Sequence, residues 1–310
     1  MTAAPSSRLA YALLIFTALF WSGNAIAGKL AVGHIAPMTL TAVRWTVAFA
    51  IILAIGWPNA RRQWPELRRS MKVLFPLGAV GFSLFNLALY SALQYTSAIN
   101  VTIEQAAMPL VIFATNLVLF GMRIGPVQVV GFVLTVIGVA ITASGGDITR
   151  LAGLEVNQGD AIMLIAVLAY GGYTVALRYK PELDWQTVMV GMAFAAMVVA
   201  WPFAIWENAH GAGYMPDLRG LGVAAYTAIF PSILAQVFYI RGIELIGSNR
   251  AGLFINLVPV FGTLLAIVIV GETFHPYHAL ALVMVIGGIA LSEHNANRSA
   301  GLEATSKSGR

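Results

Sequence analysis

The sequence predicts an all-α polytopic membrane protein with ten transmembrane helices, arranged as two inverted five-helix repeats. Composition, ten long apolar segments and an internal duplication carry this prediction. Hydrophobic residues make up 59% of the 310 residues and charged residues 10%, with a mean hydropathy of +0.80. Soluble domains carry about 25% charged residues, so this chain has too few charges to cover a water-exposed surface. Because it contains no cysteine, disulfides and thiolate metal sites are excluded.

Five apolar segments are expected in the first half, over residues 9–32, 35–57, 72–95, 97–120 and 126–144. Each approaches the roughly 20 residues needed to cross about 30 Å of hydrocarbon, and in lipid such runs form helices. The first imitates a cleavable signal peptide, since Arg8 precedes an apolar run that ends in Ala25-Ile26-Ala27. The stretch RRQWPELRRSMK, residues 61–72, is expected to be a cytoplasmic loop with Trp64 at the membrane interface.

The second half supplies apolar segments over residues 159–178, 185–206, 219–241, 249–270 and 276–293. Connections between segments are short, so no soluble domain is appended. We expect the first repeat to occupy residues 1–146 and the second, inverted repeat to occupy 147–294. Residues 295–310 are expected to form a disordered cytoplasmic tail.

Two stretches of the chain match one another without a gap. MPLVIFATNLVLFGMRIGPVQVVGFVLTVIGVA, from residue 108, lies over VPVFGTLLAIVIVGETFHPYHALALVMVIGGIA, from residue 258, at an offset of 150. ALFWSGNAIAGK, from residue 18, lies over VLAYGGYTVALR, from residue 167, at an offset of 149. The first segment therefore has a counterpart and is expected to be retained. Because five is odd, the second copy enters the membrane upside down. Inverted repeats are typical of secondary transporters; a duplication serving structure alone is the alternative.

The basic residues predict the orientation. With a cytoplasmic N-terminus, 14 of the 18 fall on the cytoplasmic side, three fall outside, and Arg44 lies within a span. The positive-inside rule then places both termini in the cytoplasm. We expect a multi-pass protein of the bacterial inner (plasma) membrane.

Several motifs resemble those of a known family. They are FWSGN near the start, ALQYTSA over 92–98 leading to Pro109, GIELIGSNRAGLFINLVPV over 242–260, and Gly271-Glu272. On these motifs the chain resembles the EamA-type transporters of the drug/metabolite transporter superfamily, and most of all the YddG-type exporters of aromatic amino acids. The resemblance implies that the first four helices of each repeat line the pathway and the fifth is outer scaffold. In one departure, the position matching Glu272 in the first half is Met122.

Polar side chains recur at three- or four-residue spacing on five of the predicted helices, so each set shares one helix face. Such a face must point to protein or to a wet cavity. Interhelical hydrogen bonds, worth about 0.6 kcal/mol on average, are the alternative. Five helices share the pattern, four of them with an aromatic residue on the stripe or beside it, and this favours a lined cavity. Thr17, Ser83 and Ser232 lie on these stripes. The candidate substrate-binding residues are Trp21, Asn24, Asn86, Tyr90, Tyr170, Tyr173, Gln236, Tyr239 and Asn256.

The expected cavity offers amides to a carboxylate and π-faces to an ammonium or a ring. A phosphorylated sugar would need a deep cluster of basic residues, and only Arg44 is present. We therefore expect a secondary or facilitative transporter that exports amino acids, aromatic and other, or similar small amphipathic metabolites. The alternative is a polyspecific efflux carrier of drugs or quaternary cations. A channel or an intramembrane enzyme is less favoured, because no selectivity filter or HExxH spacing occurs.

No cofactor, metal, nucleotide or nucleic acid is expected, and the protein should function as a monomer. GNAIAGKL, residues 23–30, fits the start of a phosphate-binding loop but has Leu30 in place of the final Ser or Thr. Its glycines are expected to permit close helix packing instead. Gly131, Gly138, Ala281 and Gly288 are expected to do the same.

Two ionisable groups share a depth in the first repeat. Glu104 lies about 10 Å below Ser97 and Arg44 about 12 Å below Ala36, from a rise of about 1.5 Å per residue. An unpaired charge in hydrocarbon costs at least about 2.5–3.5 kcal/mol. The favoured hypothesis is a Glu104–Arg44 ion pair that fixes the outer half of the cavity. The alternatives are a coupling role, with Glu104 binding a substrate ammonium or a proton, and snorkelling or solvation.

Two prolines occupy equivalent positions in the repeats. Pro109 and Pro259 fall near the middle of segments 97–120 and 249–270, where each should bend its helix. Bends at the midplane can serve as hinges. A static kink that only aids packing is the alternative.

Overall fold

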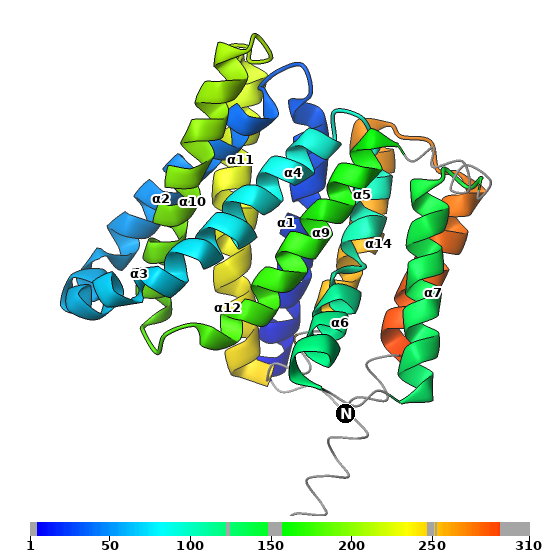
Figure 1. Cartoon of the computed structure of the whole chain (residues 1–310), viewed down its shortest axis with the longest axis horizontal. Coiled ribbons are helices and arrows are strands. Elements are labelled where there is room, and N and C mark those ends of the chain that lie inside the picture. The colour runs from blue at the N-terminus through cyan, green and yellow to red at the C-terminus, as the bar shows by residue number, and fades with distance from the viewer. Residues whose placement is uncertain (1–4, 122–124, 148–156, 247–250, 252, 292–310) are drawn as a thin grey trace, which may run out of the picture.

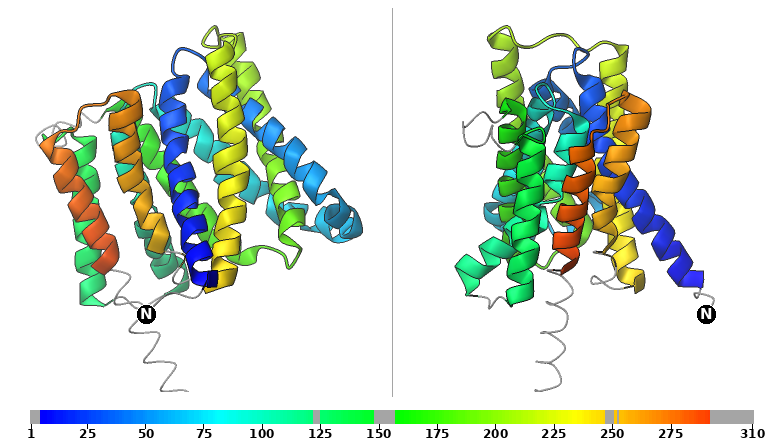
Figure 2. Two further views of the ribbon diagram at one scale, coloured as in Figure 1. Left: turned by 180° about the vertical axis from the view of Figure 1, so that it is seen from behind. Right: turned by 90° about the vertical axis from the view of Figure 1, so that its right-hand side faces the viewer.

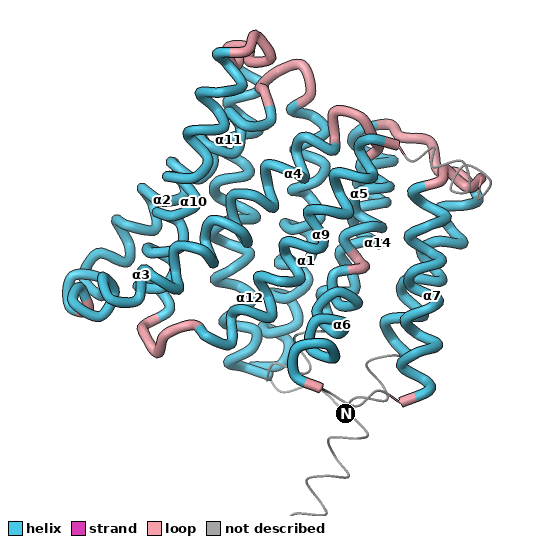
Figure 3. Tube along the Cα trace, in the orientation of Figure 1, coloured by secondary structure: helices cyan, strands magenta, loops and turns pink. Residues whose placement is uncertain are grey.

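The computed structural model describes residues 5–121, 125–147, 157–246, 251 and 253–291, and these are helical apart from short turns (Figure 3). Five membrane-crossing units form the first half. They are α1 (Pro5–Ala31), α2 (Pro37–Arg62), the run of α3 (Trp64–Gly78), η1 (Ala79–Leu84) and α4 (Phe85–Ala92), the pair α5 (Ala98–Gln105) and α6 (Met108–Phe120), and α7 (Pro126–Ala143).

The second half repeats this order. Its units are α9 (Gln158–Ala176) with η2 (Leu177–Tyr179), α10 (Trp185–Ala209), the run of α11 (Leu218–Ile229), η3 (Phe230–Leu234) and α12 (Ala235–Ile246), the run of η4 (Leu253–Leu257), α14 (Val258–Leu265) and η5 (Ala266–Val270), and a C-terminal helix over Pro276–Leu291. Eight helices of the described residues are long and apolar enough to cross a membrane, and two shorter apolar helices complete the ten that were predicted.

The two halves run in opposite directions. In Figure 1, α1 rises from the end of the bundle marked N, whereas α9 begins at the opposite end and descends. We call these the N-terminal end and the far end. The C-terminal helix finishes at the N-terminal end, which is the same end at which α1 begins (Figures 1 and 2). The predicted inversion of an odd-numbered unit is therefore present in the arrangement of the helices.

The stretch RRQWPELRRSMK is helical, so its prediction as a loop was wrong. α2 continues to Arg62, only Gln63 interrupts it, and α3 starts at Trp64. Pro65 lies in the first turn of α3, where its missing N–H removes no helical bond, and Glu66 favours the positive end of the helix dipole. The charged residues therefore extend the helices beyond the apolar core, and Arg62 reaches Asp184 at 2.5 Å.

The two paired prolines begin new helices. Pro109 is the second residue of α6, after a turn at Ala106 and Ala107, and Pro259 is the second residue of α14, after the 3-10 helix η4. A proline in the first turn removes no helical hydrogen bond. The expected bends are thus complete interruptions at equivalent points of the two repeats.

The fifth helices of the two halves pack together at one edge of the bundle (Figures 1 and 2). A Cβ added to Gly138 of α7 would lie 3.0 Å from the Ala281 carbonyl oxygen, and one on Gly288 would lie 2.4 Å from the Gly131 carbonyl oxygen. The small residues that the sequence predicted as packing sites therefore bring these backbones into contact. Their place at the edge fits the outer scaffold implied by the family resemblance.

Candidate functional site

A buried arginine lies at the centre of the bundle. Arg44, on the second turn of α2, has only 4% of its surface exposed. Its Nε donates to Ser232 Oγ at 2.8 Å, and one terminal nitrogen donates to Asn24 Oδ1 at 2.8 Å, to Asn86 Oδ1 at 2.6 Å and to the Tyr90 hydroxyl. All four partners are neutral oxygens from α1, η1/α4 and η3. We call these five residues the Arg44 cluster.

The two π-helical segments hold these partners in place. The carbonyl of Phe82, inside η1, accepts from Asn86 Nδ2 and, at 3.2 Å, from Trp45 Nε1. In η3 the Ser232 hydroxyl donates to the Thr227 carbonyl, five residues earlier, at 2.8 Å. Each of these segments lies within the third span of its repeat, so both repeats widen that span. Such π-bulges often occur at functional sites.

The expected ion pair between Arg44 and Glu104 is not formed. Arg44 donates to the neutral oxygens named above, and no salt bridge joins it to Glu104 within the described part of the chain. Both Glu104 carboxylate oxygens are buried without a hydrogen-bond partner there. Equal depth did not bring the two groups together, because Glu104 lies instead within electrostatic range of Asp160 on α9.

Aromatic side chains form a second layer beside the Arg44 cluster. The rings of Trp21 and Tyr239 lie 5.3 Å apart, and those of Tyr170 and Tyr173 lie 5.2 Å apart. Tyr170 is close enough to Tyr239 to interact with it electrostatically, and its ring lies 4.8 Å from that of Phe85. These contacts join α1, α4, α9 and α12. We call the five residues the aromatic layer.

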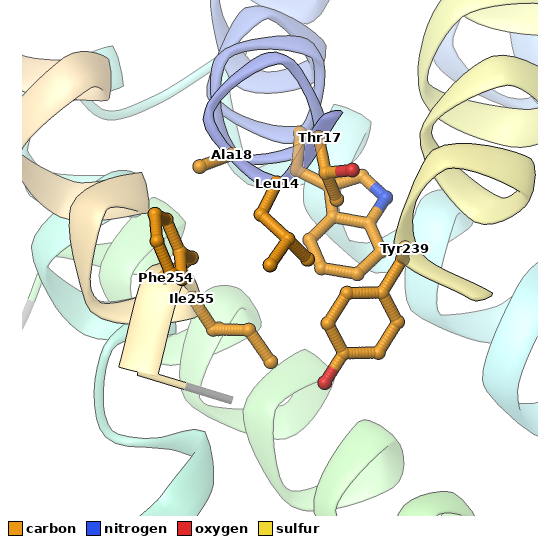
Figure 4. Close-up of a pocket in the computed structure, with 7 residues that line it drawn as sticks. Leu14, Thr17, Ala18, Tyr239, Phe254 and Ile255 are labelled. Carbon is orange, nitrogen blue, oxygen red and sulfur yellow. The ribbon is translucent and has the colours of Figure 1, made fainter. Parts of the chain in front are cut away.

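A shallow pocket of about 140 Å³ opens beside this layer. Figure 4 shows its side chains converging from α1, α12 and the segment before α14. The lining residues are Leu14, Thr17, Ala18, Trp21, Tyr239, Phe254 and Ile255. That volume includes space open to solvent, and the interior of the pocket has no room for a molecule the size of water. A ligand that reaches Trp21 from here would therefore have to move side chains or helices.

The two ends of the bundle differ in burial, although the repeat relates them. At the far end, every residue of α5 from Ala98 to Glu104 is buried. At the N-terminal end, residues 254–257 are half-buried or exposed, whereas Glu104, Ala106 and Ala107 are buried at the corresponding positions 104–107. In α4 six of eight residues are buried, whereas in the related α12 only Ala235 and Gly242 are. The far end is thus tightly packed and the N-terminal end is looser.

The structure gathers most of the sequence-predicted residues at these two layers. Gln236 and Asn256 are half-buried, and neither has a side-chain hydrogen bond to another described residue. The residues that come together are Asn24, Asn86 and Tyr90 in the Arg44 cluster and Trp21, Tyr170, Tyr173 and Tyr239 in the aromatic layer.

Several neighbours of the site were missed in the sequence. Phe254 and Ile255 line the pocket, and Tyr226 lies so close to Gly23 that a Cβ there would approach its hydroxyl oxygen to 2.1 Å. Ser232 was noticed only as part of a polar stripe. These residues come from the second repeat and meet α1 across the bundle, so no local spacing reveals them.

Two glutamates have structural partners that no motif indicates. Glu207 accepts from the backbone nitrogens of Met38 and Thr39, at 3.0 and 2.9 Å, at the start of α2. Glu272 accepts from those of Ala98 and Ile99, at 2.7 and 2.9 Å, at the start of α5. A carboxylate there satisfies free N–H groups and complements the helix dipole. Both glutamates therefore tie the second half to the far end of the first.

The phosphate-loop likeness has a packing explanation. A Cβ on Gly28 would lie 2.6 Å from a Leu93 side-chain carbon, so this glycine permits close contact with the third span. Lys29 Nζ donates to the carbonyls of Leu93 and Thr96, at 3.1 and 2.6 Å. Lys29, the residue that would contact a nucleotide phosphate in such a loop, is thus bound to backbone carbonyls instead.

Comparisons with known proteins match most of the chain. The profile of the EamA-like transporter family matches it twice, over residues 8–144 and 157–293. Uncharacterized transporters similar to it include YyaM of Bacillus subtilis, 25% identical over 90% of this chain and 92% of that protein. Another is YetK of the same organism, 23% identical over 90% of this chain and 85% of that protein. A solved structure described only as a crystal structure of a protein has the same fold. Its TM-score is 0.62 at 22% identity, covering 93% of this chain and 98% of the other.

Proposed function

The chain belongs to the EamA-like transporter family, and from that premise we propose that this membrane transporter exports amino acids, aromatic ones included, or similar small amphipathic zwitterions. As a member of this family it is a multi-pass transporter and not an enzyme. The Arg44 cluster is the observation that carries the substrate proposal. Its only charged group is a guanidinium that is held by neutral oxygens.

A guanidinium binds a carboxylate through two parallel charged hydrogen bonds, which are stronger than those to neutral oxygens. A buried cation is costly while its partners are uncharged. A substrate carboxylate that displaced the Asn24 and Asn86 oxygens would neutralise Arg44 at the depth where transporters of this type hold their substrates. Arg44 thus supports recognition of a carboxylate.

The aromatic layer supports an organic side chain as the other end of the substrate. Trp21 lies one helical turn before Asn24 on α1, so a molecule bound at Arg44 would extend along α1 toward Trp21 and Tyr239. Aromatic faces accept an ammonium group or another ring. This arrangement fits the likeness to the YddG-type exporters of aromatic amino acids.

A quaternary cation is the second candidate, and the aromatic layer is the observation that favours it. Arg44 opposes it, because two positive charges held together in a medium of low dielectric repel one another strongly. The two candidates therefore differ in one measurable respect, which is whether the substrate carries a carboxylate.

The direction of transport follows from the proposed orientation. With both termini in the cytoplasm, the looser N-terminal end faces the cytoplasm and the far end faces outward. Substrate would enter beside Trp21, and the helix interruptions at Pro109 and Pro259 would serve as hinges when the far end opens. The inverted repeat supports such an exchange, because each half can adopt the packing that the other now has.

Counterflow in proteoliposomes tests this proposal. Vesicles loaded with unlabelled phenylalanine should accumulate labelled phenylalanine in a saturable manner, and empty liposomes should not. An excess of a quaternary ammonium dye should leave this counterflow unchanged. Saturable movement of the dye, with no movement of any amino acid, would replace the proposal with the rival.

A further inference from the structure

Glu104 is a carboxylate buried in the middle of the far half. None of its surface is exposed, and neither oxygen has a hydrogen-bond partner among the described residues. A lone ionised carboxylate is very unfavourable in such a place, so the group must be neutralised. Arg44 does not do this, since its own bonds are made elsewhere.

The charged neighbour of Glu104 is a second buried acid. Asp160, in the first turn of α9, has 2% of its surface exposed and interacts electrostatically with Glu104. The Thr96 hydroxyl donates to Asp160, and Asn100 Nδ2 lies 3.5 Å from each of its oxygens. Asp160 thus has donors that suit an ionised carboxylate, whereas Glu104 has none.

An unused acceptor lies on the same helix face as Glu104. Asn100 precedes Glu104 by four residues, and its Oδ1 is buried without a donor. A proton on Glu104 would turn one of its oxygens into a donor. That change would remove the buried charge and supply a donor for Asn100 Oδ1 or for Asp160.

The inverted repeat independently supports the proximity of these two positions. The offsets of 150 and 149 place Phe254 at the position of Glu104 and Tyr11 at the position of Asp160. The rings of Tyr11 and Phe254 are stacked with centroids 5.6 Å apart. An aromatic stack at the N-terminal end therefore corresponds to a pair of acids at the far end.

Two titratable groups around the pair, Lys29 and Tyr90, are engaged elsewhere, whereas Tyr277 interacts electrostatically with Asp160. Lys29 bonds backbone carbonyls and has Glu272 as its acidic neighbour, and Tyr90 bonds Arg44. α6, α7 and α14, which pack around α5 and α9, carry no ionisable side chain among their described residues. The titratable and charged groups near the pair are Lys29, Tyr90, Glu272, His275, Tyr277 and His278.

We propose that Glu104 and Asp160 together hold one exchangeable proton, and that this proton must be bound before the far end can close. Two buried carboxylates within electrostatic range of each other resist ionising together. The proton passes from water at the open far end to a Glu104 oxygen, and it returns to that water when the far end reopens. Closure over an unprotonated pair would bury two negative charges. In the proposed exporter this acid pair links the outer proton concentration to the transport cycle.

Infrared difference spectroscopy on the full-length protein in lipid, without substrate, tests this inference independently of what is transported. Raising the pH from mildly acidic to mildly alkaline should remove the carbonyl band of one protonated carboxylic acid. Glu104→Gln should abolish that change completely, while Glu244→Gln, the same substitution at an exposed site on α12, should leave it intact. The proposal would be overturned if Glu104→Gln still lost the full carboxylic-acid band when the pH was raised. It would also be overturned if sodium, and not pH, removed the band.

A labelling experiment examines the closure. The chain has no cysteine, so a single thiol can report access. Ala98→Cys, at a buried position in the first turn of α5, should react with a water-soluble maleimide several-fold faster at alkaline than at acidic pH. The rates are corrected by those of Met215→Cys, at an exposed position in the loop before α11, because a thiolate forms as pH rises. In the Glu104→Gln background the corrected rate should stay low at both values. An equal pH response with and without Glu104 would contradict the proposal.

Discussion

Replacing Arg44 with glutamine removes the charge to which we assign the substrate carboxylate. The glutamine amide can still donate to one or two of the oxygens of Asn24, Asn86 and Ser232, so it leaves fewer buried acceptors unpaired than alanine would. Arg44→Lys keeps the charge but cannot make two parallel bonds to a carboxylate. The two variants therefore separate charge from bidentate geometry.

The expected magnitude follows from the bonds that are lost. A hydrogen bond to a charged group contributes about 1.5–3 kcal/mol, and each 1.4 kcal/mol is about tenfold in affinity. Arg44→Gln should therefore raise the phenylalanine concentration at half-saturation roughly 10- to 100-fold. Arg44→Lys should raise this concentration less than Arg44→Gln does, because lysine keeps the positive charge but cannot make the two parallel hydrogen bonds.

The assay is the concentration dependence of phenylalanine counterflow, at equal amounts of folded protein in the vesicles. Arg61→Gln is the matched control, since it makes the same substitution on α2 at an exposed residue outside the site. If Arg44→Gln reached half-saturation at the same phenylalanine concentration as the native protein, Arg44 would not bind the substrate carboxylate. Equal loss in Arg61→Gln would show that the effect is not local.

Three further predictions concern other contacts. Tyr239→Ala should reduce phenylalanine counterflow and Tyr239→Phe should largely preserve it, because the ring, tilted against that of Trp21 with centroids 5.3 Å apart, matters more than its hydroxyl. Gly138→Leu should lower the Tm in detergent, since the side chain meets Val285 and the Ala281 carbonyl, and overpacking costs about 1–3 kcal/mol. The Gly220 N–H, followed by His34, lowers the pKa of the exposed Asp217 carboxyl. This contact should therefore contribute stability above the usual pKa of aspartate and lose it as pH falls through the lowered value, a dependence that Asp217→Asn should remove from Tm measured against pH.

Each of these has a control. Tyr179→Ala replaces an exposed tyrosine, so this variant should transport normally. If Tyr239→Phe lost all counterflow, the hydroxyl of Tyr239 and not its ring would be the group that matters. A side chain at Gly287 would point into open space, so Gly287→Leu should keep the native Tm. If its Tm fell as far as that of Gly138→Leu, the close contact between α7 and the C-terminal helix would not explain the loss of stability. An unchanged pH response of Tm in Asp217→Asn would show that His34 and Gly220 do not stabilise the far-end loop.

Hydropathy and the duplication were sufficient to predict the ten helices and their inversion, because both depend on features that extend along the chain. Pro109 and Pro259 also predicted where the fourth spans change course. The helical stretch after Arg61 was missed because charge was taken to indicate a loop, whereas an amphipathic helix can leave the membrane without unwinding.

The candidate site could be predicted as a set of residues but not as an arrangement. Spacing placed Asn24, Asn86 and Tyr90 on suitable faces, yet it could not show that all three would meet Arg44. Depth along a helix was known for Glu104, but the direction in which its side chain points depends on how helices pack. The roles of Glu207 and Glu272 depend on contacts between residues more than 160 positions apart, which leave no trace in local sequence.

Recognition of a carboxylate by Arg44 is tested most directly by one competition measurement. Labelled phenylalanine counterflow is measured against unlabelled phenylalanine and against phenethylamine, which has the same ring and amine but no carboxylate. If Arg44 binds the carboxylate, phenylalanine competes strongly and phenethylamine competes little. Phenethylamine that competes as well as phenylalanine would show that Arg44 does not bind a substrate carboxylate and would indicate a site for organic cations.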